Sequence, residues 1–269
     1  GEPNLLTAFF RQPADLRYQP EELLRVLRQG QFFETSQHDW VYGAYRGVIQ
    51  DYGSIPLSLA THGRALCRRC VVLRENFFQR VQSAAESLLP RRHRWLAVHV
   101  RRADKACEAQ ANFELTDDDI LQRIASQCGV WCCDAVFLCS DDGALKQRLR
   151  DRLSASVEAG GFGLVVTSYP STLSAVQGQA AHFDKSLDRY KKAEDVVVEA
   201  LLMARGCHGL LSTFSNVSAS VVYLSPDGFP YATFWDPLEA PAAASEVAGG
   251  GAEVGALSRC AEARTALAA

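Results

Sequence analysis

The sequence predicts an α/β fold built on a parallel sheet, because short apolar runs alternate with helical patterns between Trp95 and Trp235. The runs lie at 96–100, 135–139, 163–167 and 208–212. Continuous apolar runs of this length are typical of strands that are covered on both faces. Strands that alternate with helices form parallel sheets, and these bind their ligands beyond the carboxyl ends of the strands.

Helical stretches separate these strands, at 116–124, 140–149 and 193–206. The first opens with Thr116 three residues before Asp119, which is an N-cap pattern. The second starts with Ser140 and acidic residues, which suit the positive end of a helix. The third ends on Gly206, as helices often do.

Composition divides the chain into three parts. Residues 1–94 are less regular, with a helix expected at 20–30 and an amphipathic helix at 75–89, and we expect a smaller, partly truncated N-terminal lobe there. Residues 95–239 carry the alternating strands and helices, so we expect one Rossmann-like domain in this range. Residues 240–269 have few large apolar side chains to offset the entropy of ordering, so a disordered tail is predicted there.

The overall composition argues against partners that bind by charge or by membrane insertion. The chain has 269 residues, is 48% hydrophobic and carries a formal charge of −3, so no general attraction to nucleic acid or to anionic lipid is expected. No run approaches the ~20 apolar residues that span a bilayer. The chain begins with Gly1, and we expect it to be an excerpt, so it carries no information on localisation.

The nine cysteines indicate packing rather than metal binding. Cys67 and Cys70 have C-x-x-C spacing, but no second pair completes a zinc site. Cys128 and Cys139 lie in apolar stretches and are expected in the core. A disulfide that involves Cys67 or Cys70 remains an alternative in an oxidising compartment.

The first strand runs directly into a cluster of charges, since residues 96–110 read L-A-V-H-V-R-R-A-D-K-A-C-E-A-Q. One interpretation is structural, with Arg101 or Arg102 paired to Asp104. The position at the end of a central strand favours a ligand instead, because two arginines can fork onto phosphate oxygens. A nearby glutamate can then act as a base. No glycine-rich phosphate loop is present, so a glycine cradle is excluded.

Two other strand ends carry polar groups that would meet at the same edge. The stretch L-S-T-F-S-N-V-S (211–218) leaves a strand and enters a helix, whose hydroxyls and first amides suit an anion. Ordinary N-capping by Ser215 or Asn216 is the structural alternative, and one residue can do both. The stretch L-C-S-D-D (138–142) places two carboxylates beyond another strand.

Together, H-V-R-R-A-D-K, C-S-D-D and S-T-F-S-N-V-S resemble the three peptide motifs of fucosyltransferases that use GDP-fucose. The α1,6-fucosyltransferase group, which includes core-fucosylating and nodulation enzymes, is the most similar. The resemblance covers about 75–236 and implies a GT-B-like enzyme that inverts at the anomeric carbon, needs no metal or other cofactor, and modifies N-glycans in the Golgi. The partners it implies are GDP-fucose, bound by residues 95–239, and a glycan acceptor on the side of the N-terminal lobe at residues 1–94.

The resemblance assigns roles to residues of all three motifs. It implies a catalytic set of Arg101 on the β-phosphate, Asp104, Lys105 and Glu108, with Glu108 as the base if a one-residue gap is allowed. It implies a nucleotide-binding set of His99 near the guanine, Arg101, Arg102, Asp141, Asp142, Glu199, Thr213, Ser215 and Asn216. Ala103 departs from the family, in which threonine is usual at this position.

Three functions are compatible with these observations. The first is fucose transfer to a glycan, with α1,6 linkage to N-acetylglucosamine. The second is a lectin-like relic of the same fold that binds GDP or a GDP-sugar without chemistry. The third is a different nucleotide-sugar transferase, since a fold does not fix its chemistry.

Overall fold

The computed structural model describes residues 9–11, 57–101, 116–171, 188–213, 215–229 and 231–235. The expected helix at 20–30 and the expected tail at 240–269 lie outside these residues, as do Arg102, Asp104, Lys105 and Glu108. The division at residue 94 remains a prediction.

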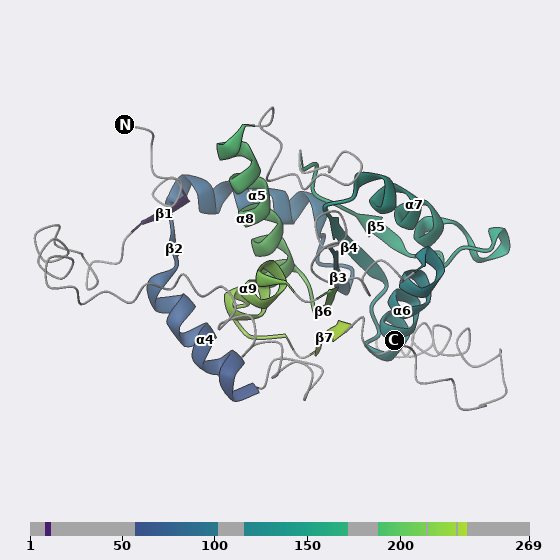
Figure 1. The fold of residues 1–269 in the computed structure, drawn as a ribbon, viewed down its shortest axis with the longest axis horizontal. Helices are drawn as coiled ribbons and strands as arrows, with labels where there is room; N and C mark the ends of the chain where they lie inside the picture. The colour runs from purple at the N-terminus through teal and green to yellow at the C-terminus, as the bar shows by residue number, and fades with distance from the viewer. Residues whose placement is uncertain are drawn as a thin grey trace, which may run out of the picture.

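A five-stranded parallel sheet forms the centre of the molecule, in the order β5-β4-β3-β6-β7 (Figure 1). Its strands are β3 (Trp95–Val100), β4 (Ala135–Ser140), β5 (Val165–Thr167), β6 (Gly209–Thr213) and β7 (Tyr231–Trp235). β3 occupies the central position and pairs with β4 on one side and β6 on the other. The α/β class with a Rossmann-like parallel sheet is therefore confirmed.

Two helical layers cover the sheet, one on each face (Figure 1). The helices are α4 (Leu57–Cys70), α5 (Glu75–Leu88), α6 (Asp117–Val130), α7 (Gly143–Ser154), the 3₁₀ turn Val157–Ala159, α8 (Arg189–Gly206) and α9 (Asn216–Leu224). A small antiparallel pair joins β1 (Phe10–Arg11) to β2 (Val72–Leu73).

Alternation along the strands directs side chains into two separate cores. Ala97 and Phe137 face α5, α8 and α9, whereas Val98 and Leu138 face α6 and α7. All four are fully buried, as expected for strands of a sheet covered on both faces.

Cys128 and Cys139 are buried in these cores, which confirms their predicted role in packing. Phe77 of α5 lies in the same core as Ala97 and Phe137, so α5 packs on that face of the sheet.

Two strands differ from the sequence prediction. The run 163–167 was expected to be covered on both faces, but β5 is an edge strand and Val165 is 43% exposed. The segment Tyr231–Trp235 was not among the expected strands, and it forms β7, the opposite edge strand.

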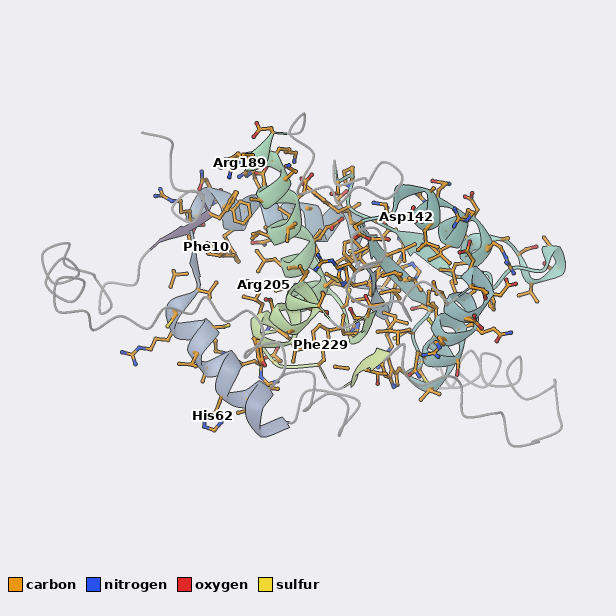
Figure 2. All side chains as sticks on the ribbon, in the orientation of Figure 1. Phe10, His62, Asp142, Arg189, Arg205 and Phe229 are labelled. Atoms are coloured by element: carbon orange, nitrogen blue, oxygen red, sulfur yellow. The ribbon has the colours of Figure 1, made fainter. Side chains whose placement is uncertain are left out.

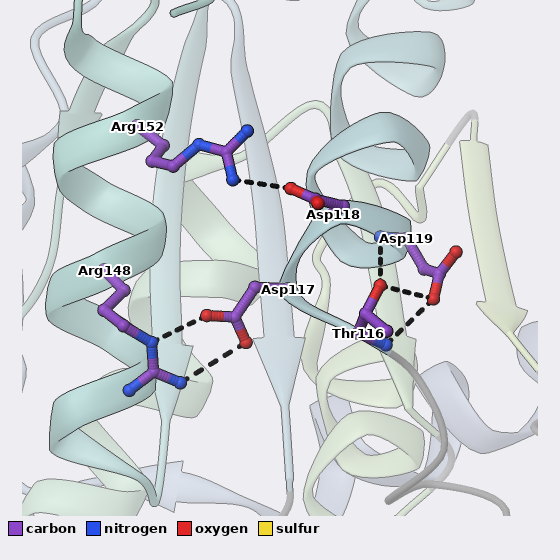
Figure 3. Close-up of polar contacts among 6 residues, drawn as sticks. All are labelled: Thr116, Asp117, Asp118, Asp119, Arg148 and Arg152. Atoms are coloured by element: carbon purple, nitrogen blue, oxygen red, sulfur yellow. Dashed lines mark hydrogen bonds and ion pairs between the residues drawn. The ribbon is translucent and has the colours of Figure 1, made fainter.

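The starts of α6 and α7 follow from local side-chain chemistry. Thr116 and Asp119 form the expected capping box, in which the Thr116 hydroxyl accepts from the Asp119 amide at 3.1 Å (Figure 3). Ser140 was expected to open the next helix, and this was wrong. Ser140 is the last residue of β4, and Asp142 caps α7 by accepting from the Leu145 amide at 2.9 Å.

Two ion pairs join the first turn of α6 to the middle and the last turn of α7. Asp117 pairs with Arg148 at 2.6 Å, and Asp118 pairs with Arg152 at 2.5 Å (Figure 3). Both arginines are more than half exposed, so solvent screens the pairs and they contribute little to stability.

Candidate functional site

The carboxyl ends of β3, β4 and β6 lie at one edge of the sheet, because all three strands are parallel. Arg101 directly follows β3, and its amide donates to Thr213 Oγ1 at 3.0 Å. Thr213 is the last residue of β6 and is buried. Two of the predicted site residues, 112 positions apart, are thus joined by a hydrogen bond.

His99 lies one residue before the end of β3 and faces the side of α8. Its Nδ1 lies 3.2 Å from Ser212 Oγ, and Ser212 Oγ in turn donates to the Thr213 carbonyl at 2.7 Å. Because the Ser212 hydroxyl hydrogen is used in that bond, its oxygen accepts from His99, so Nδ1 carries the hydrogen and Nε2 keeps a lone pair. Burial, followed by the nearby Arg101 charge, lowers the pKa of His99 to about 4. His99 is therefore a neutral hydrogen-bonding group at pH 7.

The start of α9 lies directly after β6 at the same edge. Ser215 is its N-cap and forms a capping box with Ser218, in which Ser215 Oγ accepts from the Ser218 amide at 3.1 Å. The Ser218 hydroxyl also donates to the Thr213 carbonyl at 3.0 Å, so strand end and helix start are held together. The capping box uses the Ser218 amide, which leaves the first-turn amides of residues 216 and 217 without an acceptor in the helix, and such amides bind anions. Asn216 is the first residue of α9, so its backbone belongs to this helix start.

The paired aspartates occupy different environments beyond β4. Asp142 Oδ1 is used in the cap of α7. The negative charge of Asp141 is one of the causes that raise the pKa of Glu199. Asp142 therefore serves as the N-cap of α7, while the negative charge of Asp141 acts on Glu199 in the predicted site.

Glu199 places a buried carboxyl beneath this edge. It lies on α8, is 9% exposed, and its Oε1 has no hydrogen-bond partner among the described residues. Burial raises its pKa to about 8, with Lys146 acting in the opposite direction and Asp195 and Asp141 adding to the rise. A buried oxygen without a donor costs about 1–3 kcal/mol, so this carboxyl suits a ligand that supplies one.

A second buried acid on α8 was missed at the level of sequence. Asp195 is fully buried and binds Lys191 Nζ at 2.6 Å and Ser171 Oγ at 3.4 Å. Glu194 beside it pairs with Arg80 at 2.6 Å. The signal was available, because residues 195 and 199 stand at i, i+4 spacing in a largely apolar helix and must share one face.

Four of the predicted site residues follow Arg101 in the sequence and are not part of this arrangement as described. Arg102, Asp104, Lys105 and Glu108 lie outside the described residues, so their roles remain predictions. Cys67 and Cys70 are free thiols. Within the described ranges, no group of three or more His, Cys, Asp or Glu side chains is arranged to hold a metal, and no helix is long and apolar enough to cross a membrane.

Solved structures with a similar fold include GDP-fucose-dependent fucosyltransferases. NodZ α-1,6-fucosyltransferase co-crystallised with GDP is 19% identical, with 60% of this chain and 44% of that chain aligned and a TM-score of 0.36. The NodZ structure from Bradyrhizobium gives the same values. POFUT1 in complex with GDP-fucose is 12% identical, with 66% of this chain and 50% of that chain aligned and a TM-score of 0.40.

These similarities concern the fold alone, and this chain spans about half the length of those proteins. Neither a family model nor a curated protein sequence matches the chain.

Proposed function

We propose that this chain binds GDP-fucose and transfers fucose to a glycan acceptor, with α1,6 linkage to N-acetylglucosamine. The single observation that carries the proposal is the hydrogen bond from the Arg101 amide to Thr213 Oγ1, with Ser215 opening α9 directly beyond it. It brings the first and third sequence motifs to one edge, where an arginine and helix amides suit a diphosphate. The Golgi is the compartment that this function implies.

The chemistry we propose is a single inverting displacement without a metal. The bond between fucose C1 and the β-phosphate oxygen breaks, and its electron pair leaves with GDP. The acceptor hydroxyl oxygen forms the new bond to C1 from the opposite face, and its proton passes to the Glu108 carboxylate, tuned by Lys105. Arg101 and the start of α9 stabilise the negative charge on the departing diphosphate.

We assign base recognition to the buried carboxyl of Glu199 on α8 and to His99 near the end of β3. Guanine offers N1–H and an exocyclic amino group as donors, and the carboxyl has an oxygen without a partner. If guanine binds the carboxylate form, binding releases a proton, because the pKa of free Glu199 is about 8. Affinity for GDP should then rise about tenfold from pH 6 to 7 and about fivefold from pH 7 to 8, as the ionised fraction of Glu199 grows, and Glu199→Gln should abolish this slope.

Donor choice is tested by calorimetry with GDP, GDP-fucose, GDP-mannose and a UDP-sugar. Preference for GDP-fucose, followed by release of GDP with a glycan acceptor, supports the proposal. Binding of GDP-fucose without transfer to any acceptor would support the non-catalytic relic instead. A preference for another sugar nucleotide would support a different transferase of the same fold.

A further inference from the structure

A groove of about 880 Å³ lies at the opposite edge of the sheet, away from the candidate donor site. Its floor consists of four side chains that are at most 5% exposed, namely Val81, Leu89, Trp95 and Leu201. Trp95 begins β3 and His208 immediately precedes β6, so the groove is at the amino ends of the strands. The volume is in the range that holds a small organic molecule.

Basic residues surround this apolar floor. Arg91, His93, Arg205 and His208 line the groove, and of these the two arginines carry the positive charge, whereas Glu86 is the single acidic lining residue. Gln82 Nε2 donates to Glu86 Oε1 at 3.1 Å, which satisfies part of that carboxylate. The lining therefore has an excess of positive charge, which suits an anion.

Arg205 is the groove arginine whose position best suits a bound anion. Arg205, which is labelled in Figure 2, lies in the last turn of α8. Its guanidinium is 5.4 Å from the centroid of the Phe78 ring. It forms no ion pair with a carboxylate among the described residues, and its side chain is exposed, with partial burial that lowers its pKa. A guanidinium held over an aromatic ring beside an apolar floor suits a ligand with a flat apolar body and one acidic group.

Two neighbouring histidines add polar contacts without competing for that acid. His93 Nδ1 pairs with Asp134 Oδ2 at 2.9 Å, and Arg92 Nε donates to His93 Nε2 at 3.2 Å, so this ring is already engaged. Burial, followed by the nearby charge of Arg94, lowers the pKa of His208. Arg205 and Arg91 are then the groove cations available to an anion.

We propose that this groove is a second binding site, which takes a small aromatic or similarly flat organic anion with a carboxylate or sulfonate group. The acid pairs with the Arg205 guanidinium, and the apolar body lies on Phe78 and the floor beside Leu201. This site is separate from the donor site, because it lies at the other end of the same strands. The inference does not depend on the proposed fucose transfer.

The test uses a matched pair of fluorescent probes. 1-Anilinonaphthalene-8-sulfonate carries the acid, and N-phenyl-1-naphthylamine is its uncharged counterpart. Both are titrated into the wild-type protein and the Arg205→Gln, Arg205→Lys and Arg150→Gln variants. Arg150 is an exposed arginine of α7 on the other face of the sheet, so its variant is the control.

We expect the sulfonate to bind saturably and about tenfold more tightly than the uncharged probe, since a charge-assisted hydrogen bond contributes on this scale. Arg205→Gln should remove that preference, while Arg205→Lys should keep part of it and Arg150→Gln all of it. Circular dichroism confirms that each variant is folded. The proposal is overturned if the Arg205→Gln variant binds the sulfonate within twofold of the wild-type affinity. It is also overturned if saturating GDP displaces the sulfonate.

Discussion

Replacement of the buried Glu199 by glutamine should change how the stability of the protein depends on pH. The pKa of this carboxyl rises from its ordinary value of 4.5 to about 8 in the folded chain. A raised folded-state pKa contributes stability that is fully present below pH 4.5 and is lost as pH rises through 8. The wild-type protein should therefore lose stability across this window, and Glu199→Gln should lack this loss because an amide does not ionise.

The magnitude follows from the size of the shift. At about 1.4 kcal/mol for each pH unit, the change from 4.5 to about 8 corresponds to at most about 5 kcal/mol. Relaxation and water entry reduce the cost of burying a charge, so we expect about 2–5 kcal/mol. Against a typical total of about 5–15 kcal/mol, this is a large part of the stability of a domain.

Urea unfolding at pH 5, 7 and 9, followed by circular dichroism, measures the effect. The free energy of unfolding of wild type minus that of Glu199→Gln should fall steadily from pH 5 to pH 9. Glu86→Gln, at an exposed position on α5, is the matched control and should follow wild type at every pH. If the curves for wild type and Glu199→Gln run parallel, Glu199 titrates as an ordinary surface acid and the argument for a buried ligand-seeking carboxyl is refuted.

Four further substitutions address the site, a second helix cap and the core. Arg101→Ala should lower fucose-transfer turnover by about 10²–10³, since it removes one donor to the departing diphosphate, and near-normal turnover would contradict its proposed role. Ser215→Ala and Thr116→Ala each remove a capping box and should each cost about 1 kcal/mol in urea unfolding, but only the first should weaken GDP binding in calorimetry. Equal GDP affinity in both would argue against an anion site at α9. Gly209→Ala places a methyl group 2.8 Å from the Trp131 ring and should cost about 1–3 kcal/mol, measured as a lower unfolding midpoint.

Features that depend on a few neighbouring residues could be predicted from the sequence. The capping box of Thr116 and Asp119 is complete within four residues, so its pattern was sufficient. The central place of β3 followed from the order of strands and helices together with its apolar run. The exposure of β5 could not be predicted, because it depends on which strand ends the sheet and not on the composition of Val165–Thr167.

The candidate site shows the same division. Topology was enough to expect Arg101 and Thr213 at one edge, since carboxyl ends of parallel strands converge. The division of roles between Asp141 and Asp142 was not predictable, because the end of β4 at Ser140 determines which aspartate caps α7. The buried pair of Asp195 with Lys191 was also missed, since a charged helix turn with this spacing is more often exposed to solvent.

The hydrogen bond between Arg101 and Thr213 has a consequence for synthesis on the ribosome. The two halves of the candidate site are separated by 112 residues of chain, and β6 must insert beside β3 before they meet. Contacts between such distant segments form slowly and late, after helices and neighbouring strands. A nascent chain that stops short of α9 therefore lacks half of the site, and ligand added during translation should protect only chains that have emerged beyond it.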